Sequence, residues 1–145
     1  MITGKSGETT PTGNLMAGKR GLVMGVANNR SIAWGIAKSA VQQGAEVALT
    51  YQGEALKKRV GPLAEELGSN IVLPCDVTDG PSMDSVFEHL KATWGRLDFL
   101  VHAIAFSDKN ELDGRYLDTS EDNFTKTMLI SCYSLTLSLI HISEP

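Results

Sequence analysis

The sequence predicts an α/β fold, a Rossmann-like doubly wound parallel sheet that is truncated after its fourth strand and helix. Two observations support this prediction. Short apolar segments of strand length alternate with amphipathic helical segments, a pattern typical of parallel sheets with right-handed crossovers. The first such strand, at about 20–24, runs through a short turn directly into a helix. Sheets of this kind bind ligands beyond the carboxyl ends of their strands.

Composition limits the function classes. The chain has 145 residues, of which 42% are hydrophobic and 21% are charged, and its net charge is −4. We therefore expect one soluble domain, and the absence of a basic excess argues against a nucleic-acid partner. No apolar run approaches the ~20 residues that cross a bilayer, so a cytoplasmic protein without membrane contact is expected. Cys75 and Cys132 are isolated and lack metal-ligand spacing, which predicts reduced thiols and no metal site.

The order of elements divides the chain into three parts. Residues 1–17 are rich in Gly, Thr and Ser and predict a flexible leader. Residues 18–136 predict the N-terminal part of a single dinucleotide-binding domain. Its strands are expected at 20–24, 46–51, 71–75 and 99–102, and its helices at 31–43, 54–67, 81–94 and from 121 onward. Pro74 predicts that the third strand lies at a sheet edge, and Gly61-Pro62 predicts a kink or break in the second helix.

Helical spacing predicts which faces are buried. In the first helix, two sets of residues four apart give a broad apolar face: Ile32, Ile36 and Ala40, and Ala33, Ala37 and Val41. In the helix from 121, the apolar residues that share one face are Phe124, Met128, Cys132 and Leu135.

The turn after the first strand predicts a phosphate site. Gly25 leaves the backbone unobstructed at the strand end, and the following helix presents its positive N-terminus to an anion. Ser31 stands where the usual dinucleotide fingerprint has glycine. Its hydroxyl is expected either to hydrogen bond a phosphate or only to cap the helix.

The ends of the second and third strands predict how the nucleoside part of a dinucleotide is recognised. Gln52 ends the second strand and can hydrogen bond ribose hydroxyls without charge, and no arginine sits beside it for a 2′-phosphate. This favours NADH over NADPH. Asp76 follows the third strand and can accept a hydrogen bond from the adenine amino group, while Val77 packs on the ring. The alternative is that Asp76 serves only as a turn residue. After the fourth strand, Ile104 and Ala105 offer a small apolar surface for a nicotinamide ring, and His102 is expected to be structural.

These segments together resemble the bacterial NADH-dependent enoyl-acyl-carrier-protein reductases, a divergent branch of the short-chain dehydrogenase/reductase superfamily. Five segments carry the resemblance in register over about 18–136: GVA at 25–27, SIA at 31–33, TYQ at 50–52, CDV at 75–77 and VHAIAF at 101–106. The resemblance implies cofactor contacts at Gly25, Ser31, Ile32, Gln52, Asp76, Val77 and Ile104. It implies a substrate contact at Ser107, and Ala105 departs from the glycine of many members.

The resemblance also implies the reaction. Members use NADH to reduce the double bond of an enoyl thioester on acyl carrier protein in type II fatty acid synthesis, and they form homotetramers. Their catalytic Tyr-x6-Lys pair follows a later strand. The one match here, Tyr51 with Lys58, lies on the adenosine side, so no catalytic residue is assigned and the chain is expected to be inactive alone. A carbonyl-reducing short-chain dehydrogenase and a non-catalytic dinucleotide-binding module remain alternatives.

The last nine residues, 137–145, read LSLIHISEP. One reading frame of a widely used transposon-end sequencing adapter encodes this string, so we expect a non-native tail. The alternative is that the last helix simply continues. Ser138, His141 and Glu144 are not a hydrolase triad, because one short stretch cannot position three groups separately.

Overall fold

Four parallel strands form the centre of the molecule. The structure is a computed structural model that describes residues 9–143, with only the backbone at 143. The strands lie side by side in the order β3-β2-β1-β4. Their bounds are Arg20–Met24 for β1, Glu46–Tyr51 for β2, Val72–Pro74 for β3 and Phe99–His102 for β4. The predicted parallel sheet is confirmed, and β3, which contains Pro74, lies at its edge as predicted.

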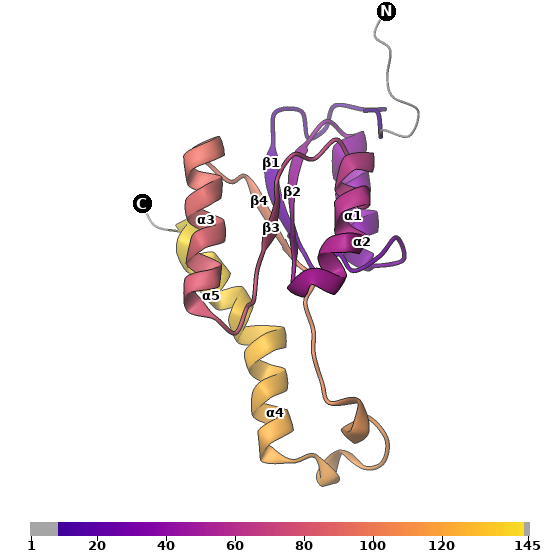
Figure 1. The fold of residues 1–145 in the computed structure, drawn as a ribbon, viewed down its shortest axis with the longest axis vertical. Coiled ribbons are helices and arrows are strands. Elements are labelled where there is room, and N and C mark those ends of the chain that lie inside the picture. The colour runs from indigo at the N-terminus through magenta and orange to yellow at the C-terminus, as the bar shows by residue number, and fades with distance from the viewer. Residues whose placement is uncertain (1–8, 144–145) are drawn as a thin grey trace, which may run out of the picture.

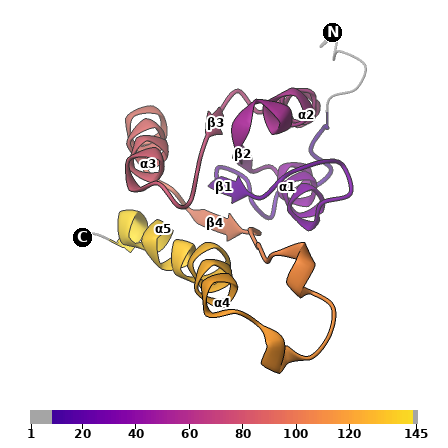
Figure 2. The same ribbon diagram turned by 60° about the horizontal axis from the view of Figure 1, so that its bottom comes forward.

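Helices cover both faces of this sheet. Helices α1 and α2 lie on one face and α3 and α5 on the other, while α4 and the loop before it extend away from the sheet (Figures 1 and 2). The bounds are Ile32–Gln42 for α1, Gly53–Glu66 for α2, Gly80–Trp94 for α3, Glu121–Met128 for α4 and Ser134–Ser143 for α5. A π-helical turn, Leu129–Tyr133, joins α4 to α5.

Helix α3 begins and ends for local reasons. The Asp79 carboxylate caps α3 by accepting a hydrogen bond from the Ser82 N–H, and Gly95 ends that helix in the left-handed conformation. The α2 helix runs through Pro62 as one element, so the predicted break at that proline does not occur.

The core consists of two apolar clusters, one on each side of the sheet. Alternate residues of β1 enter opposite clusters: Val23 packs with α1 and α2, and Leu22 and Met24 pack with α3. All three side chains are fully buried. A strand buried on both faces reads as a continuous apolar run, which is why β1 is recognisable in the sequence.

The segment before β1 is docked against two helix ends. The Thr9 N–H donates to the Glu66 carbonyl, and the N–H groups of Thr12 and Met16 donate to the carbonyls of Gln42 and Gln43. These bonds satisfy carbonyl groups that α1 and α2 leave open at their C-termini. Residues 9–17 of the predicted leader thus lie against the helices, and residues 1–8 lie outside the described part of the chain.

Two predicted helix faces differ from the structure. The α1 face carrying Ile32 and Ile36 is solvent-exposed, whereas the adjacent face with Ala33 and Ala37 is buried. The predicted stripe of Phe124, Met128, Cys132 and Leu135 is also exposed. The buried residues are Asn123, Ser134 and Ser138. Small side chains let this helical segment approach the sheet closely, and the larger apolar side chains point away from it.

The described part of the C-terminal segment continues as helix α5. Leu137 and Ile142 pack against the core cluster that contains α3, and Ser138 is fully buried. The His141 ring stacks on Phe87 with centroids 4.7 Å apart, and its Nε2 lies 3.1 Å from Asp84. Among residues 9–143, no helix combines the length and the apolar character needed to cross a membrane.

Candidate functional site

A cavity of about 220 Å³ opens beyond the carboxyl ends of the strands. It lies where the strand order reverses, because β2 and β4 flank β1 on opposite sides. Four chain segments line it: residues 25–27 after β1, 50–52 at the end of β2, 75–78 after β3 and 103–106 after β4, with Leu56 and Ile130 added. The four strand ends that the sequence predicts to form the site thus meet in one place.

Most of the predicted site residues line this cavity. They are Gly25, Gln52, Asp76, Val77 and Ile104. The predicted contacts Ser31, Ile32 and Ser107 do not line it. The Ile32 side chain is 80% exposed. Ser107 lies beyond the cavity wall, with its Oγ 3.5 Å from the Asn123 amide nitrogen.

Gly25 is required where β1 leaves the sheet. Its φ of 100° is a left-handed conformation that residues with a Cβ rarely adopt. A Cβ at this position would also overlap the backbone carbonyl of Ala103. The segments after β1 and β4 are this close because the Ala103 N–H donates to the Met24 carbonyl at 3.1 Å. The glycine therefore serves the junction of β1 and β4 as well as the approach of a ligand.

Ser31 holds the turn rather than the helix. It precedes α1, but its side chain makes no capping hydrogen bond. Its Oγ instead accepts hydrogen bonds from the N–H groups of Ala27 and Asn28, each at 3.0 Å. The interpretation that Ser31 only caps the helix is therefore wrong.

This arrangement leaves donors facing outward. A hydroxyl that accepts two hydrogen bonds still has its own hydrogen to donate. No side chain caps α1. The Trp34 N–H donates to the Ser31 carbonyl, which leaves the N–H groups of Ile32 and Ala33 for an anion. Ile32 begins this helix, so it can contact a ligand through its backbone even though its side chain points to solvent.

Gln52 and Asp76 contact each other across the cavity rim. The Gln52 Nε2 donates to Asp76 Oδ2 at 3.0 Å. The other oxygen, Oδ1, accepts from the Thr78 hydroxyl at 2.6 Å and from the Thr78 N–H at 2.9 Å. The sequence predicted contacts of these two residues to different parts of a nucleoside. The structure adds that they fix one another.

These contacts and partial burial set the pKa values of Asp76 and of its neighbour Cys75. The Thr78 hydroxyl, then the Thr78 N–H and the Gln52 amide, lower the pKa of Asp76 below its ordinary value, although partial burial opposes them. Asp76 is therefore ionised at neutral pH. Burial, together with the charge of Asp76, raises the pKa of the Cys75 thiol to about 11, so this thiol is protonated and is not a nucleophile.

His102 ends β4 but does not line the cavity. Its Nε2 lies 2.7 Å from Ser134 Oγ, and burial lowers the pKa of the imidazole. Within residues 9–143, no group of His, Cys, Asp and Glu side chains is arranged to hold a metal ion. The sequence did not single out Ser131 and Ser134, whose contacts depend on the π-helical turn.

Comparison with known proteins identifies related chains. A family model described as Enoyl-(Acyl carrier protein) reductase matches residues 25–144. Enoyl-[acyl-carrier-protein] reductase [NADH] 1 of Rhizobium meliloti is 67% identical over 122 residues, which are 84% of this chain and 45% of that protein. The corresponding FabI protein of Rickettsia felis is 55% identical over 124 residues, 86% of this chain and 48% of that one. The chain thus spans about half the length of these relatives.

Solved structures of the same kind superpose well. The enoyl-acyl-carrier-protein reductase of Anaplasma phagocytophilum, in complex with NAD, has a TM-score of 0.88 and 59% identity, covering 91% of this chain and 51% of that one. The Bacillus cereus enzyme, in complex with NADP+ and indole naphthyridinone, has a TM-score of 0.86 and 43% identity, covering 88% and 51%. Both coenzymes therefore occur among the similar structures.

Proposed function

The chain belongs to the enoyl-(acyl carrier protein) reductase family, and we propose that it is the coenzyme-binding part of an NADH-dependent reductase of enoyl thioesters on acyl carrier protein. The names of its relatives support this reaction, which belongs to type II fatty acid synthesis. Because the chain spans about half of those relatives, the activity is that of a longer protein. We place the Tyr-x6-Lys pair implied by the family outside these 145 residues.

The observation that carries the proposal is that four strand ends with groups suited to a dinucleotide meet around one cavity, and that the first of them leads into the N-terminus of α1. The N-terminus of α1, which no side chain caps, offers backbone N–H groups to a diphosphate, and Gly25 leaves the backbone of the preceding turn open to its approach. The free hydroxyl hydrogen of Ser31 adds a donor beside them. Asp76, ionised and held in place by Gln52 and Thr78, offers a fixed acceptor to an adenine amino group. These residues fit NADH, which supplies the hydride when bound.

The remaining cavity residues position the two ends of the coenzyme. Val77 packs beside the adenine, and Ile104 packs beside the nicotinamide, where apolar surface excludes water. Ser107, next along the chain, is proposed to contact the substrate. Gln52 supplies no positive charge for a 2′-phosphate, and the adjacent Asp76 carboxylate repels one. This favours NADH over NADPH.

Further features of the longer protein are part of the proposal. We propose that it is cytoplasmic, that it forms a homotetramer, and that it contacts neither nucleic acid nor membrane. We also propose that residues 137–145 are adapter-encoded and replace the native continuation after Thr136. Sequencing the gene independently through this point tests the last statement directly: a native reading frame that encodes LSLIHISEP would contradict it.

The function is tested on the longer protein with NADH and a short enoyl thioester. We expect calorimetric binding of NADH that is tighter than that of NADPH, and oxidation of NADH only when the enoyl thioester is added. Replacing Asp76 with alanine should weaken NADH binding about tenfold, since it removes a charged acceptor and leaves donors unpaired. The matched variant Asp84→Ala, on the exposed side of α3, should bind NADH normally.

The alternatives predict different results. A carbonyl-reducing enzyme would oxidise NADH with a ketone substrate and not with the enoyl thioester. A non-catalytic module would bind the coenzyme with neither substrate being reduced. Absence of binding for both NADH and NADPH would contradict all three interpretations.

A further inference from the structure

The cavity wall formed by residues 103–106 has little secondary structure of its own. Strand β4 ends at His102, and the Ala103 N–H makes the last hydrogen bond to the sheet. The next residues, Ile104 and Ala105, line the cavity as irregular backbone. An irregular segment needs contacts from elsewhere in the fold to keep one conformation.

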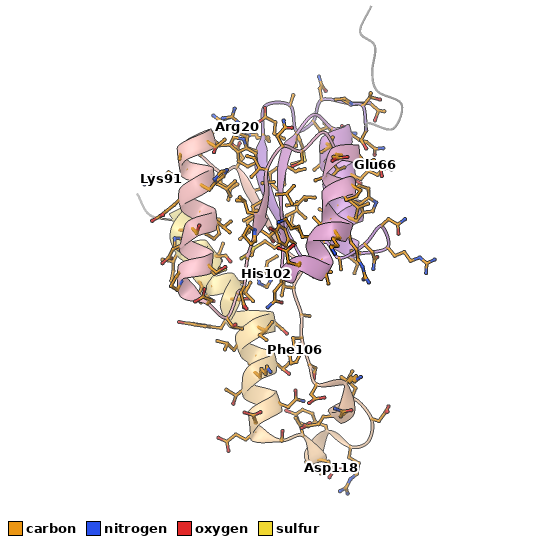
Figure 3. All side chains as sticks on the ribbon, in the orientation of Figure 1. Arg20, Glu66, Lys91, His102, Phe106 and Asp118 are labelled. Atoms are coloured by element: carbon orange, nitrogen blue, oxygen red, sulfur yellow. The ribbon has the colours of Figure 1, made fainter. Side chains whose placement is uncertain are left out.

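One serine side chain holds the far end of the wall. The Phe106 N–H donates to Ser131 Oγ at 3.0 Å, and the Ser131 hydroxyl donates to the Phe106 carbonyl at 3.2 Å. A single hydroxyl thus satisfies both backbone groups of one residue, as a paired strand would. The Lys126 ammonium lies 5.0 Å from the centre of the Phe106 ring and adds a weaker contact. In Figure 3, Phe106 lies beside α4.

A second serine holds the near end of the wall. Ser134 Oγ donates to the Ile130 carbonyl at 2.7 Å, and it forms a second hydrogen bond of 2.7 Å with His102 Nε2. The lowered pKa of His102 keeps the ring neutral at physiological pH. His102 and Phe106 bracket the wall, and each is bound to a serine of the same helical segment.

The π-helical turn explains why these serines meet the wall. It contains Ser131 and ends immediately before Ser134, and its Ile130 side chain also lines the cavity. A π-turn adds a residue and changes the direction in which the following side chains point. The side chains of α4 and α5 can therefore face different neighbours, and the turn itself contacts the cavity wall.

From these contacts we propose that Ser131 is a positioning residue for coenzyme binding. It fixes the backbone of residues 103–106, the part of the cavity wall that meets the nicotinamide end of the coenzyme. The proposal rests on the function proposed above. Ser131 does not line the cavity, so it acts through Phe106. Ser134 supports the other end of the same wall through His102.

The test replaces Ser131 with alanine in the longer protein. Losing one hydrogen-bonding hydroxyl, at about 1 kcal/mol, should raise the Kd and the KM for NADH about fivefold and accelerate hydrogen exchange of the Phe106 amide by a similar factor. The kcat at saturating NADH should change less than twofold, because the chemical groups are intact. Ser131→Thr keeps the hydroxyl and should restore both values. The control Cys132→Ala changes the exposed neighbour in the same turn.

The two readouts separate the two proposals. Faster exchange at Phe106 with a higher KM for NADH, rescued by threonine, supports the positioning role. Unchanged KM and unchanged exchange in Ser131→Ala would overturn it, and so would an equal effect of Cys132→Ala. If the unsubstituted protein bound no coenzyme at all, the proposed function would fail and the positioning role with it, whereas the exchange experiment would still show whether Ser131 holds Phe106. If Ser131→Ala did not fold, the threonine variant would decide: a raised KM in a folded Ser131→Thr protein would contradict the proposal.

Discussion

At the scale of single residues, Asp76 links local hydrogen bonding to pH dependence. Its folded pKa lies below the ordinary carboxyl value of 3.8, mainly because the Thr78 hydroxyl donates to the charged form. A group with a depressed folded pKa contributes stability that is fully present above its unfolded pKa and is lost as the pH falls through its folded pKa. The contribution of the Asp76–Thr78 turn is therefore constant at neutral pH and disappears only in acid.

Thr78→Val tests this assignment. The substitution removes the hydroxyl, keeps the shape and leaves the backbone N–H in place. We expect the pKa of Asp76 to rise toward 3.8, measured by carboxyl carbon chemical shifts during an acid titration. Thr78→Ser retains the hydroxyl and should leave the pKa low. An unchanged pKa in Thr78→Val would mean that the backbone N–H and Gln52 suffice.

Residue identities at the strand ends were predictable, but their partners were not. Gln52 and Asp76 stand where the strand pattern ends, so the sequence located both. Their mutual hydrogen bond depends on how β2 and β3 pair, with Tyr51 opposite Pro74. Ser31 was located equally well, yet its bonds to Ala27 and Asn28 depend on the path of the turn. Sequence position fixes which side chains reach a site, whereas backbone path fixes what they bind there.

At the scale of elements, regular periodicity predicted the positions of the strands and of the first three helices well, although part of the apolar face predicted for α1 is exposed. It failed after Glu121, because a search for apolar residues every third or fourth position assumes an unbroken α-helix. The π-helical turn at Leu129–Tyr133 interrupts that helix. The buried side of the segment consists of Asn123, Ser134 and Ser138, which carry no hydrophobic signal. Polar residues that satisfy their hydrogen bonds locally cannot be recognised as core by hydropathy alone.

The junction of β1 and β4 gives a prediction at this scale. Gly25→Ala would force a Cβ against the Ala103 carbonyl and strain a positive φ, so we expect a loss of roughly 2–4 kcal/mol in unfolding free energy. The matched control is Gly35→Ala, inside α1 with open space around it, which should stabilise by about 0.5–1 kcal/mol. Denaturant unfolding of both variants measures the difference. Equal unfolding free energies for the two variants would contradict this prediction, because they would show that β1 and β4 accommodate a Cβ at position 25 without loss of stability.

At the scale of the whole molecule, an apolar groove runs between α1 and the edge strand β4. Its lining residues include Met16, Ile32, Ile36, Phe99 and Val101. Only β1 pairs with β4 among the described strands, so the other edge of β4 is open beside this groove. An open strand edge next to an exposed apolar surface favours association between molecules. The sequence did not indicate that α1 contributes to an exposed apolar surface, because the spacing of its apolar residues suits burial on a broad face.

We therefore predict that the 145-residue chain self-associates through this groove. Ile36→Lys places a charge within it and should increase the monomer fraction in sedimentation velocity at micromolar concentration. Leu135→Lys is the matched control, since Leu135 and Ile36 are each 39% exposed, but Leu135 lies on α5, on the opposite face of the sheet. If both substitutions raised the monomer fraction equally, the loss of any exposed apolar side chain would explain the effect, because either lysine lowers the net charge only from −4 to about −3. If only Leu135→Lys raised the monomer fraction, the molecules would associate through the exposed side of α4 and α5. The groove beside β4 would then play no part in self-association.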